Sequence, residues 1–296
     1  METVGVIGLG KMGKPIARHL LNAGYTVVVH SRSQGPVEEI ASSGAIKAAT
    51  PRDVASRCEI IITSLPDAPA VESVCLGENG ICEAARKNTM LIDTSTNHPE
   101  TSRRIASALG ERGMEALDAP VSGGESGAIA GTLSIMVGGE EATFQRALPL
   151  LQKFGRTITY MGPSGSGQLT KLANQIIVAL NYAAMGEGLI LGAKAGLDPA
   201  KLLQVFLGGQ AQSRCLELKG EKIINGNYEP GGRLVLHIKD LQYALDTARA
   251  YGVPLMFTSL VQQCFEATKA AGRGEWDHSA VITLFEDLAG TKIRKR

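Results

Sequence analysis

Short runs of β-branched and aliphatic residues alternate with helical stretches through the first half of the chain. Strands that alternate with helices form parallel sheets with helices on both faces, so this order predicts a doubly wound α/β domain. The predicted strands are Thr3–Ile7, Thr26–His30, Ile60–Ser64, Met90–Asp93 and Met114–Asp118. The predicted helices between them are Lys14–Asn22, Pro36–Ser43, Pro51–Arg57 and Pro99–Arg112.

Long helical patterns replace this alternation after Gly167. Two further β-like runs, Thr132–Val137 and Thr157–Met161, precede the change and are expected to extend the sheet edge. The helical stretches that follow it are Gln168–Ala195, Pro199–Phe206, Lys239–Tyr251 and Pro254–Ala271. A chain of 296 residues has room for two domains. We predict an α/β domain over residues 1–163 and an all-helical domain over residues 164–296, opened by a long interdomain helix.

The charge balance and the cysteines limit the classes of partner. With 30 basic and 29 acidic residues the net charge is +1, which argues against a nucleic-acid-binding surface. The five Cys residues are widely spaced, so we expect buried, reduced thiols and no metal site. Nothing at the N-terminus resembles a signal peptide, and polar residues interrupt the longest apolar stretch, Leu172–Leu197. We expect a cytoplasmic protein that does not span a membrane.

A glycine motif follows the first predicted strand and opens the first predicted helix. Its pattern, GxGxxG, is typical of dinucleotide-binding loops when it stands between a strand and a helix. The first glycine permits a tight turn, the second a close approach to a pyrophosphate, and the third close helix packing. We therefore predict that the α/β domain is a Rossmann domain, with an ordinary βα turn as the alternative. The loop residues are Gly8, Leu9, Gly10, Lys11, Met12 and Gly13.

The end of the second predicted strand indicates which dinucleotide is preferred. NAD-binding sites usually carry Asp or Glu there to accept a hydrogen bond from the ribose 2′-hydroxyl. This chain has Ser31, Arg32 and Ser33 instead. Because the guanidinium of Arg suits a 2′-phosphate, we expect NADP(H) to be preferred, with NAD(H) possible. In the alternative, Arg32 stacks on the adenine of NAD.

The start of the long helix carries three polar side chains on one face. Lys171, Asn174 and Gln175 are spaced i, i+3 and i+4. Their neighbours are largely apolar, and desolvation lowers a lysine pKa toward the range that suits a proton donor or base. The alternative is a lysine whose stem lies along the surface while its charge stays in water.

A second unusual segment, Asp118–Gly124, follows a predicted strand and has the sequence DAPVSGG. Its Ser-Gly-Gly turn presents a hydroxyl and exposed amides, which suit a carboxylate, although they suit an ordinary tight turn equally. Open α/β sheets bind ligands at the carboxyl ends of their strands, which favours a binding role for this segment and for Thr94–Thr96.

Four segments in this order resemble the β-hydroxyacid dehydrogenase family over essentially the whole chain. They are the glycine loop, Asp118–Gly124, Gly165–Gln175 and Leu236–Asp240. Within that family the chain is most similar to the tartronate semialdehyde reductases, which reduce tartronate semialdehyde to glycerate. The segments that carry this closer similarity are Lys171–Asn181, Leu236–Asp240 and Asp277–Ala280.

The resemblance implies roles for individual residues. It makes Lys171 the acid/base catalyst and places the substrate carboxylate on Ser122, Gly123 and Gly124. Many members have Asn four residues after the lysine, whereas this chain has Gln175 preceded by Asn174. Which of the two amides contacts the substrate therefore stays open. Residues that the resemblance places beside the cofactor are Leu65, Pro66, Thr96 and Lys239.

The resemblance also implies an NAD(P)-dependent enzyme that reduces tartronate semialdehyde with NADPH. The alternatives are 3-hydroxyisobutyrate or another 3- or 4-hydroxy acid as substrate, or a dinucleotide-binding module without catalysis. The expected partner is a small hydroxy acid or semialdehyde, and a homodimer or homotetramer is expected because family members usually assemble so.

Several other features are expected to be structural. His237 and His278 lack the spacing of a metal site or a catalytic triad. Arg214, in a predicted loop over residues 208–214, is expected to bind an anionic group or to lie at the surface. The basic end Lys292–Arg296 is expected to be a solvated terminus.

Overall fold

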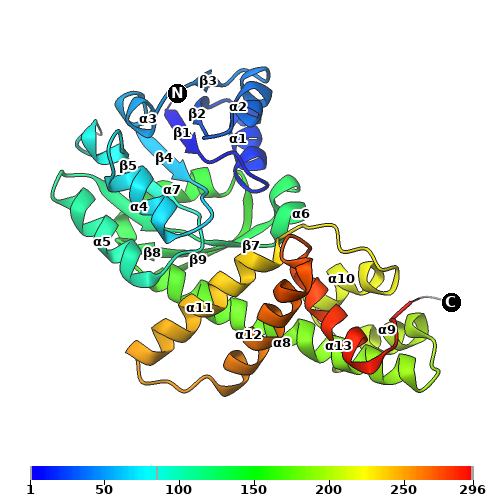
Figure 1. The fold of residues 1–296 in the computed structure, drawn as a ribbon. Coiled ribbons are helices and arrows are strands. Elements are labelled where there is room, and N and C mark those ends of the chain that lie inside the picture. Colours follow the sequence, from blue (N-terminus) through cyan, green and yellow to red (C-terminus); the bar gives the residue numbers. More distant parts are fainter. Residues whose placement is uncertain (1, 85, 295–296) are drawn as a thin grey trace. The chain divides into compact units, whose positions relative to one another are not determined.

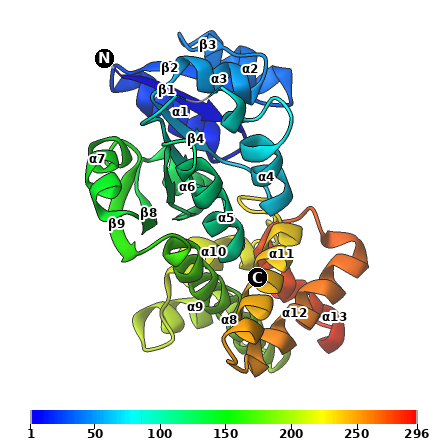
Figure 2. The ribbon, with the colours of Figure 1, turned by 90° about the vertical axis from the view of Figure 1, so that its left-hand side faces the viewer.

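A computed structural model describes residues 2–84 and 86–294 (Figures 1 and 2). By packing, the chain divides into two compact units between Lys171 and Leu172. This division lies inside helix α8 (Ser166–Lys194), later than the predicted boundary at 163/164. The reason is that hydrogen bonds hold the start of α8 to the sheet of the first unit, as at Gly165 and Gln168.

The described residues of the first unit contain a nine-stranded sheet. Its strands are β1 (Thr3–Ile7), β2 (Thr26–His30), β3 (Ile46–Lys47), β4 (Ile60–Thr63), β5 (Met90–Asp93), β6 (Glu115–Asp118), β7 (Val121–Ser122), β8 (Leu133–Gly139) and β9 (Gly155–Gly162). Strands β1 to β6 run parallel in the order β3-β2-β1-β4-β5-β6. Strand β8 is antiparallel to β6 and β7 and parallel to β9. The order of the parallel strands is that of dinucleotide-binding folds.

Helices cover both faces of this sheet because successive strand residues point to opposite sides. In β4, Ile60 and Ile62 lie in the core that contains residues of α1, α2 and α7. Ile61, between them, lies in the core that contains residues of α3, α4 and α5. The helices are α1 (Gly13–Asn22), α2 (Gln34–Ala41), α3 (Pro51–Arg57), α4 (Ala68–Leu76), α5 (Pro99–Gly110), α6 (Gly124–Ile129) and α7 (Glu141–Leu151). The doubly wound fold predicted for this part of the chain is confirmed.

In the described residues, the second unit consists of helices. After α8 these are α9 (Pro199–Gly208), α10 (Arg214–Ile224), α11 (Leu234–Ala250), α12 (Met256–Thr268) and α13 (Ile282–Ala289). Shorter turns are the π-helical Lys269–Arg273 and the 3-10 helix His278–Val281. Two glycines of α8 permit close contact, since a Cβ on Gly186 would lie 2.7 Å from Phe285 and one on Gly192 would lie 2.2 Å from Leu202.

Helix α8 is long and apolar enough to cross a membrane by length and composition alone, with a mean hydropathy of 1.6 over its most apolar stretch. The polar residues within it therefore do not exclude a span, contrary to the expectation from sequence. Within the second unit, Ala179, Tyr182 and Leu189 of this helix are buried in the hydrophobic core, whereas Ile177 and Leu191 are exposed.

The end of the chain is anchored, which corrects the prediction of a solvated terminus for residues up to 294. Ile293 is fully buried, and its backbone N donates to Oε1 of Glu286 (2.8 Å). The Arg294 guanidinium donates to the same oxygen (2.9 Å), and Lys292 Nζ lies 3.2 Å from Oε2. Glu286 is thus a buried carboxylate held by this segment. Lys295 and Arg296 lie outside the described residues.

Candidate functional site

In the glycine loop between β1 and α1, two glycines have no room for a side chain and one does. Gly8 has φ +95°, and a Cβ on it would lie 2.3 Å from the carbonyl O of Ser64. A Cβ on Gly13 would lie 1.8 Å from the carbonyl O of Gly8. A Cβ on Gly10 would meet nothing within 4 Å. The protein itself therefore does not require glycine at position 10, whereas a pyrophosphate that approaches the backbone does. The loop fits a dinucleotide.

The side chains around this loop differ in their placement. Leu9 is 2% exposed, so only its backbone can serve a ligand, whereas Met12 is half-buried against the same core. Lys11 lies 2.9 Å from Glu125 of α6. Arg32 is exposed and lies two residues after the end of β2, the neighbour of β1. Its contact to the adenosine ribose stays a prediction. Ser31 and Ser33 flank it, with Ser33 at the N-cap of α2.

The segments after β4 and β5 are hydrogen-bonded to one another. The backbone N of Leu65 donates to Ser95 Oγ (2.8 Å), so the turn with Leu65 and Pro66 contacts the turn that contains Thr96. Asp93, at the end of β5, accepts from Thr63 Oγ1 (2.8 Å) and from Asn97 Nδ2 (3.1 Å). Burial raises the pKa of the Asp93 carboxyl, and these hydrogen bonds act against that rise.

The Ser-Gly-Gly segment lies at the edge of the sheet. Ser122 is in β7 opposite Ser134 of β8 and is half-buried. Gly123 and Gly124 have φ values of +133° and +62°, which L-residues with side chains rarely adopt. A Cβ on Gly124 would meet nothing within 4 Å, so its backbone is open to a ligand.

Asp118 attaches the start of α8 to the sheet. Its two carboxylate oxygens accept from the backbone N of Gly165 (2.7 Å) and of Gln168 (2.9 Å). Gly167 permits this close approach, because a Cβ there would lie 2.4 Å from the carbonyl O of Met136. Lys171, 7% exposed, follows within the same helix. The sequence motif of Asp118 was recognised, but its role as the anchor of α8 was missed.

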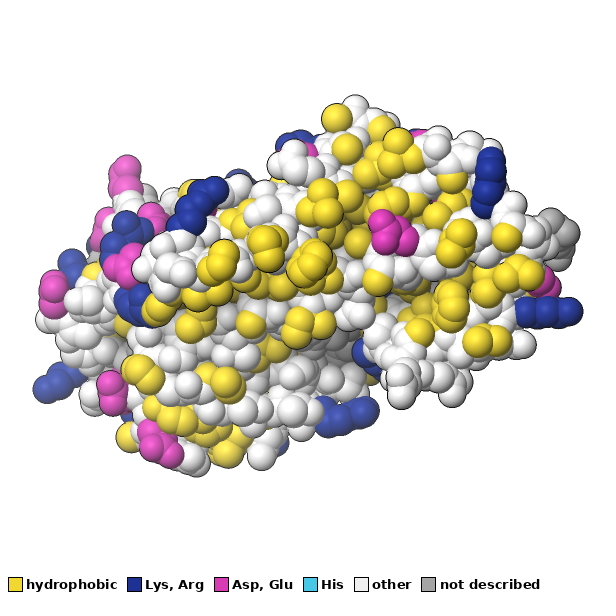
Figure 3. Space-filling view, turned by 90° about the horizontal axis from the view of Figure 1, so that it is seen from below, with side chains coloured by type: hydrophobic (Ala, Val, Ile, Leu, Met, Phe, Trp, Pro, Cys, Tyr) yellow, Lys and Arg dark blue, Asp and Glu magenta, His cyan; other side chains and the backbone are white. Residues whose placement is uncertain are grey.

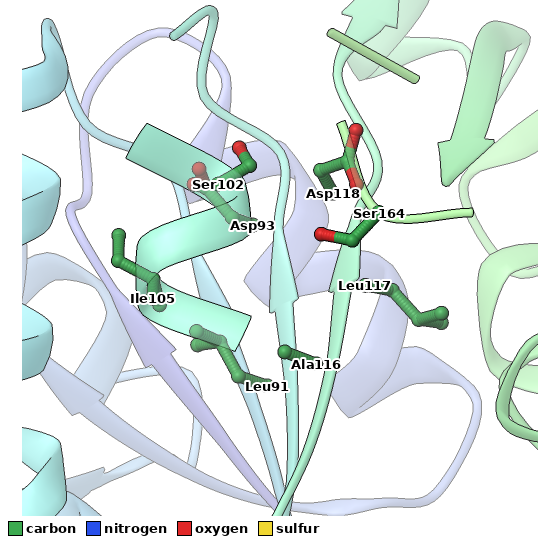
Figure 4. Close-up of a pocket in the computed structure, with 8 residues that line it drawn as sticks. All are labelled: Leu91, Asp93, Ser102, Ile105, Ala116, Leu117, Asp118 and Ser164. Carbon is green, nitrogen blue, oxygen red and sulfur yellow. The ribbon is translucent and has the colours of Figure 1, made fainter. Parts of the chain in front are cut away.

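A cavity of about 10 Å³ lies beside Asp93 and Asp118 (Figure 4). Ser102 and Ser164 also line it, and Figure 4 shows Asp118 and Ser164 close together on one side. This volume holds no more than a single water molecule. The cavity is therefore part of the buried network and cannot be the binding site for a substrate or a dinucleotide.

In the second unit, Gln175, Asp240 and Lys239 form a connected group. Gln175 Nε2 donates to Asp240 Oδ2 (2.6 Å), and Lys239 Nζ lies 2.9 Å from Asp240 Oδ1. Asn174 Nδ2 donates to Gln175 Oε1 (3.1 Å). The carboxylate of Asp240 thus binds both the Gln175 amide and the Lys239 ammonium and holds them close to each other. Sequence reasoning named both of these but missed Asp240.

The two histidines belong to a polar network of the second unit. His237 Nδ1 and His278 Nδ1 are 3.2 Å apart, and His278 Nε2 is 3.0 Å from the hydroxyl of Tyr182. Asp277 pairs with Lys219 (2.6 Å). No group of three or more His, Cys, Asp and Glu side chains that could hold a metal ion occurs within residues 2–84 and 86–294.

Arg214 and the five cysteines lie apart from the glycine loop in sequence. Arg214 begins α10 after the predicted loop and pairs with Glu217 (2.6 Å), which favours the surface role. All five cysteines are free thiols. Cys58 and Cys75 are buried as expected, whereas Cys82, Cys215 and Cys264 are only half-buried.

Known proteins similar to this chain match it from end to end. A family model for the NAD-binding domain of 6-phosphogluconate dehydrogenase matches residues 3–162. A model described as NAD-binding of NADP-dependent 3-hydroxyisobutyrate dehydrogenase matches residues 165–285. The 2-hydroxy-3-oxopropionate reductase of Escherichia coli (strain K12) is 45% identical over 98% of this chain and 99% of its own. The chain belongs to the β-hydroxyacid dehydrogenase family. This member is an NAD(P)-dependent oxidoreductase, and the predicted resemblance is confirmed.

Further relatives carry the names of other substrates. The 2-(hydroxymethyl)glutarate dehydrogenase of Eubacterium barkeri is 38% identical over 98% of this chain and 97% of its own. The crystal structure of 3-hydroxyisobutyrate dehydrogenase from Salmonella typhimurium has a TM-score of 0.88 and 29% identity, over 96% of this chain and 100% of that one. The fold of this family member, with a Rossmann domain followed by a helical domain, is thereby confirmed.

The buried Asp118 gives the stability of this dehydrogenase a specific pH dependence. Burial raises the pKa of Asp118 to about 6 from an ordinary value of 3.8, and hydrogen bonds from Gly165 and Gln168 act against that rise. The folded chain therefore binds the proton more tightly than the unfolded chain. The resulting stabilisation is complete below pH 3.8 and is lost as the pH rises through 6.

We expect this loss to amount to about 3 kcal/mol in the free energy of unfolding. Urea unfolding of the wild type and of Asp118→Asn at several pH values measures it, because Asn does not titrate. A stability difference between the two proteins that is the same at all pH values would contradict the expectation.

Proposed function

We propose that this dehydrogenase reduces tartronate semialdehyde (2-hydroxy-3-oxopropionate) to glycerate with NADPH. The observation that carries the proposal is the buried Lys171 near the start of α8, in the unit that also holds the glycine loop. Support comes from the extent of the similarity to the Escherichia coli reductase, which covers nearly the whole of both chains.

In this proposal the residues of the chain divide the chemistry among them. A dinucleotide held by the glycine loop would supply the hydride for the aldehyde carbon. The ammonium of Lys171 stabilises the negative charge that develops on the aldehyde oxygen and donates the proton to it. In the reverse direction its neutral amine accepts the proton. Ser122 and the backbone amides of Gly123 and Gly124 hold the substrate carboxylate.

The proposal also assigns roles to residues of the second unit. Gln175 is the amide assigned to the substrate, because its side chain is held by Asp240 and itself accepts from Asn174. Lys239, paired with the same carboxylate, is assigned to the nicotinamide and substrate. The loop Gly8–Gly13 and Arg32 would hold the pyrophosphate and the 2′-phosphate. Leu65, Pro66 and Thr96 would lie beside the nicotinamide.

The second candidate is a dehydrogenase of 3-hydroxyisobutyrate or of a related hydroxy acid, which uses the same residues. It is favoured by the fold match to the Salmonella typhimurium enzyme. Rates with a panel of short hydroxy acids and semialdehydes, each with NADPH and NADH, distinguish the candidates. Highest kcat/KM for tartronate semialdehyde is the expected result. A protein that binds NADPH but turns over no member of the panel would instead be a dinucleotide-binding module.

Replacing Ser122 with Ala should weaken substrate binding more than turnover. The hydroxyl is assigned to the carboxylate, which is the same in the ground state and the transition state. Loss of one hydrogen bond to a charged group is worth about 1.5–3 kcal/mol, so we expect KM to rise by about 10-fold or more with kcat nearly unchanged. Steady-state kinetics measure both constants. A fall in kcat at constant KM would contradict this role.

We also propose that the chain forms a homodimer or homotetramer through its second unit. Several large apolar side chains of that unit are more than half exposed, and Figure 3 shows a face of the molecule with many hydrophobic side chains. They include Ile177, Leu191, Val205, Met256, Phe257, Leu260 and Leu288. Contiguous exposed apolar surface is typical of protein interfaces. Light scattering should give a multiple of 31.2 kDa, and a monomeric mass would contradict the proposal.

A further inference from the structure

Gln168 is a fully buried amide in the first turn of α8 and makes two side-chain hydrogen bonds to the segment after β5. Its Nε2 donates to the carbonyl O of Ser95 (2.9 Å), and its Oε1 accepts from the backbone N of Asn97 (2.9 Å). Because one partner is an acceptor and the other a donor, only one orientation of the amide satisfies both. One side chain thus attaches residues 95–97 to α8.

The backbone of the same residue is bound to the adjacent strand. Gln168 N donates to Asp118 Oδ2 (2.9 Å) at the end of β6. Asp118 is the register partner of Asp93 in β5, and Asp93 in turn accepts from Asn97 Nδ2 (3.1 Å). Gln168 therefore closes a buried network that joins the ends of two neighbouring strands to the start of one helix.

This network lies between two parts of the proposed site. Lys171 follows Gln168 by three residues in the same helix, so a shift of the helix start moves both side chains together. On the other side, Leu65 N donates to Ser95 Oγ (2.8 Å). The turns expected beside the nicotinamide are thus attached, through Ser95, to the amide of Gln168.

We propose that Gln168 is a positioning residue that fixes Lys171 relative to the cofactor-binding turns. The inference rests on the proposed function, in which a hydride and a proton reach the two atoms of one carbonyl group. A misplacement of about 1 Å in such an arrangement costs about 100-fold in rate. Gln168 contacts neither substrate nor cofactor in this scheme and acts through Lys171 and Ser95.

Gln168→Met retains the size of the side chain and removes both of its hydrogen bonds. We expect kcat to fall by about 10-fold or more and the Kd for NADPH to change by less than about 3-fold. The primary isotope effect on kcat with C4-deuterated NADPH should increase, because hydride transfer becomes more rate-limiting. In the cofactor-free protein, the amide hydrogen of Asn97 should exchange faster with solvent.

Gln152→Met is the matched control, since it makes the same replacement at an exposed residue at the end of α7. It should leave kcat, the isotope effect and the exchange of Asn97 unchanged. A role of Gln168 in folding alone would lower stability in Gln168→Met without changing the isotope effect of the folded enzyme.

Gln168→Glu provides a second test, which applies also if the Met variant does not fold. A protonated carboxyl can accept from Asn97 N and donate to the Ser95 carbonyl, whereas a carboxylate places an oxygen against that carbonyl. Asp93 and Asp118 face this position from the sheet, and Lys171 follows it in the helix. We expect kcat relative to the wild type to rise about 3-fold or more as the pH falls from about 8 to about 6, because burial favours the neutral carboxyl.

The inference would be overturned if Gln168→Met had the same kcat, isotope effect and Asn97 exchange rate as the wild type. A ratio of Gln168→Glu to wild-type kcat that does not depend on pH would overturn it as well. If the proposed function itself is wrong, the result is different: the wild-type protein turns over no substrate of the panel.

Discussion

Lys171→Ala is expected to lower kcat by about 100-fold to 10,000-fold, the usual contribution of a general acid or base. The methyl group of Ala can neither donate the proton to the aldehyde oxygen nor stabilise the charge that develops there. The affinity for NADPH should stay near the wild-type value, because the glycine loop and Arg32 assigned to the cofactor are unchanged. Steady-state kinetics and a fluorescence titration with NADPH measure the two quantities.

Two comparisons sharpen this test of Lys171. Lys194→Ala makes the same replacement at the exposed end of α8, where Lys194 Nζ donates to the carbonyl O of Ala289, and should retain wild-type kinetics. In the wild type, the pH profile of kcat should show a group that is absent from the profile of Lys171→Ala. Turnover in Lys171→Ala within about 10-fold of the wild type would exclude this lysine as the proton donor.

Arg32→Asp is expected to reverse the cofactor preference from NADPH to NADH. The guanidinium at the end of β2 is assigned to the 2′-phosphate, and a charge-assisted hydrogen bond of this kind is worth about 1.5–3 kcal/mol. A carboxylate in its place repels the phosphate and can accept from the 2′-hydroxyl of NADH. We expect the ratio of kcat/KM for NADPH to that for NADH to fall by about 100-fold or more.

The control for the Arg32 prediction is Arg156→Asp, the same charge change at an exposed position of β9. Arg156→Asp changes the net charge by the same amount as Arg32→Asp. It should leave the ratio of kcat/KM for NADPH to that for NADH unchanged, because Arg156 is not assigned to the cofactor. A wild type that already prefers NADH would contradict the assignment of Arg32 to a phosphate. It would favour the alternative in which Arg32 stacks on adenine.

Much of the Rossmann domain could be predicted from sequence because its signals are local. The bounds of β1, β2, β5 and α3 agree with the prediction to the residue. In α3, for example, Thr50 caps the helix by accepting from Asp53 N, and Pro51 occupies its first position. Such caps mark an element within a few neighbouring residues.

The elements that were missed lack such local signals. Strands β3 and β7 contain two residues each and are defined only by their partners in the sheet. Helices α4, α6, α7, α10 and α13 were also not predicted. In α10, Gly220 lowers the helix propensity, yet a Cβ there would lie 2.4 Å from Leu203, so packing requires the glycine. Tertiary contact overrides propensity at this position.

In the site, too, local sequence signals identify some residues, whereas contacts between distant residues leave no such signal. The glycine loop and the segment from Gly165 to Gln175 were found because their chemistry lies within a dozen neighbouring residues. The bonds from Gln168 to Ser95 and from Gln175 to Asp240 join residues 73 and 65 positions apart. The sequence contains only a weak signal for these long-range bonds. Asp93 and Asp118 both end apolar runs, where burying a carboxylate without partners costs free energy.

The anchored end of the chain has a practical consequence for anyone who shortens or extends this dehydrogenase. A protein that stops at Gly290 would lose more than a loose tail, because Glu286 would lose its ion pairs with Lys292 and Arg294, and the buried Ile293 would be removed. Removing the partner of a buried ion pair costs up to roughly 3–5 kcal/mol. An affinity tag fused after Arg296 keeps the anchor, whereas trimming by a protease before Ile293 removes it.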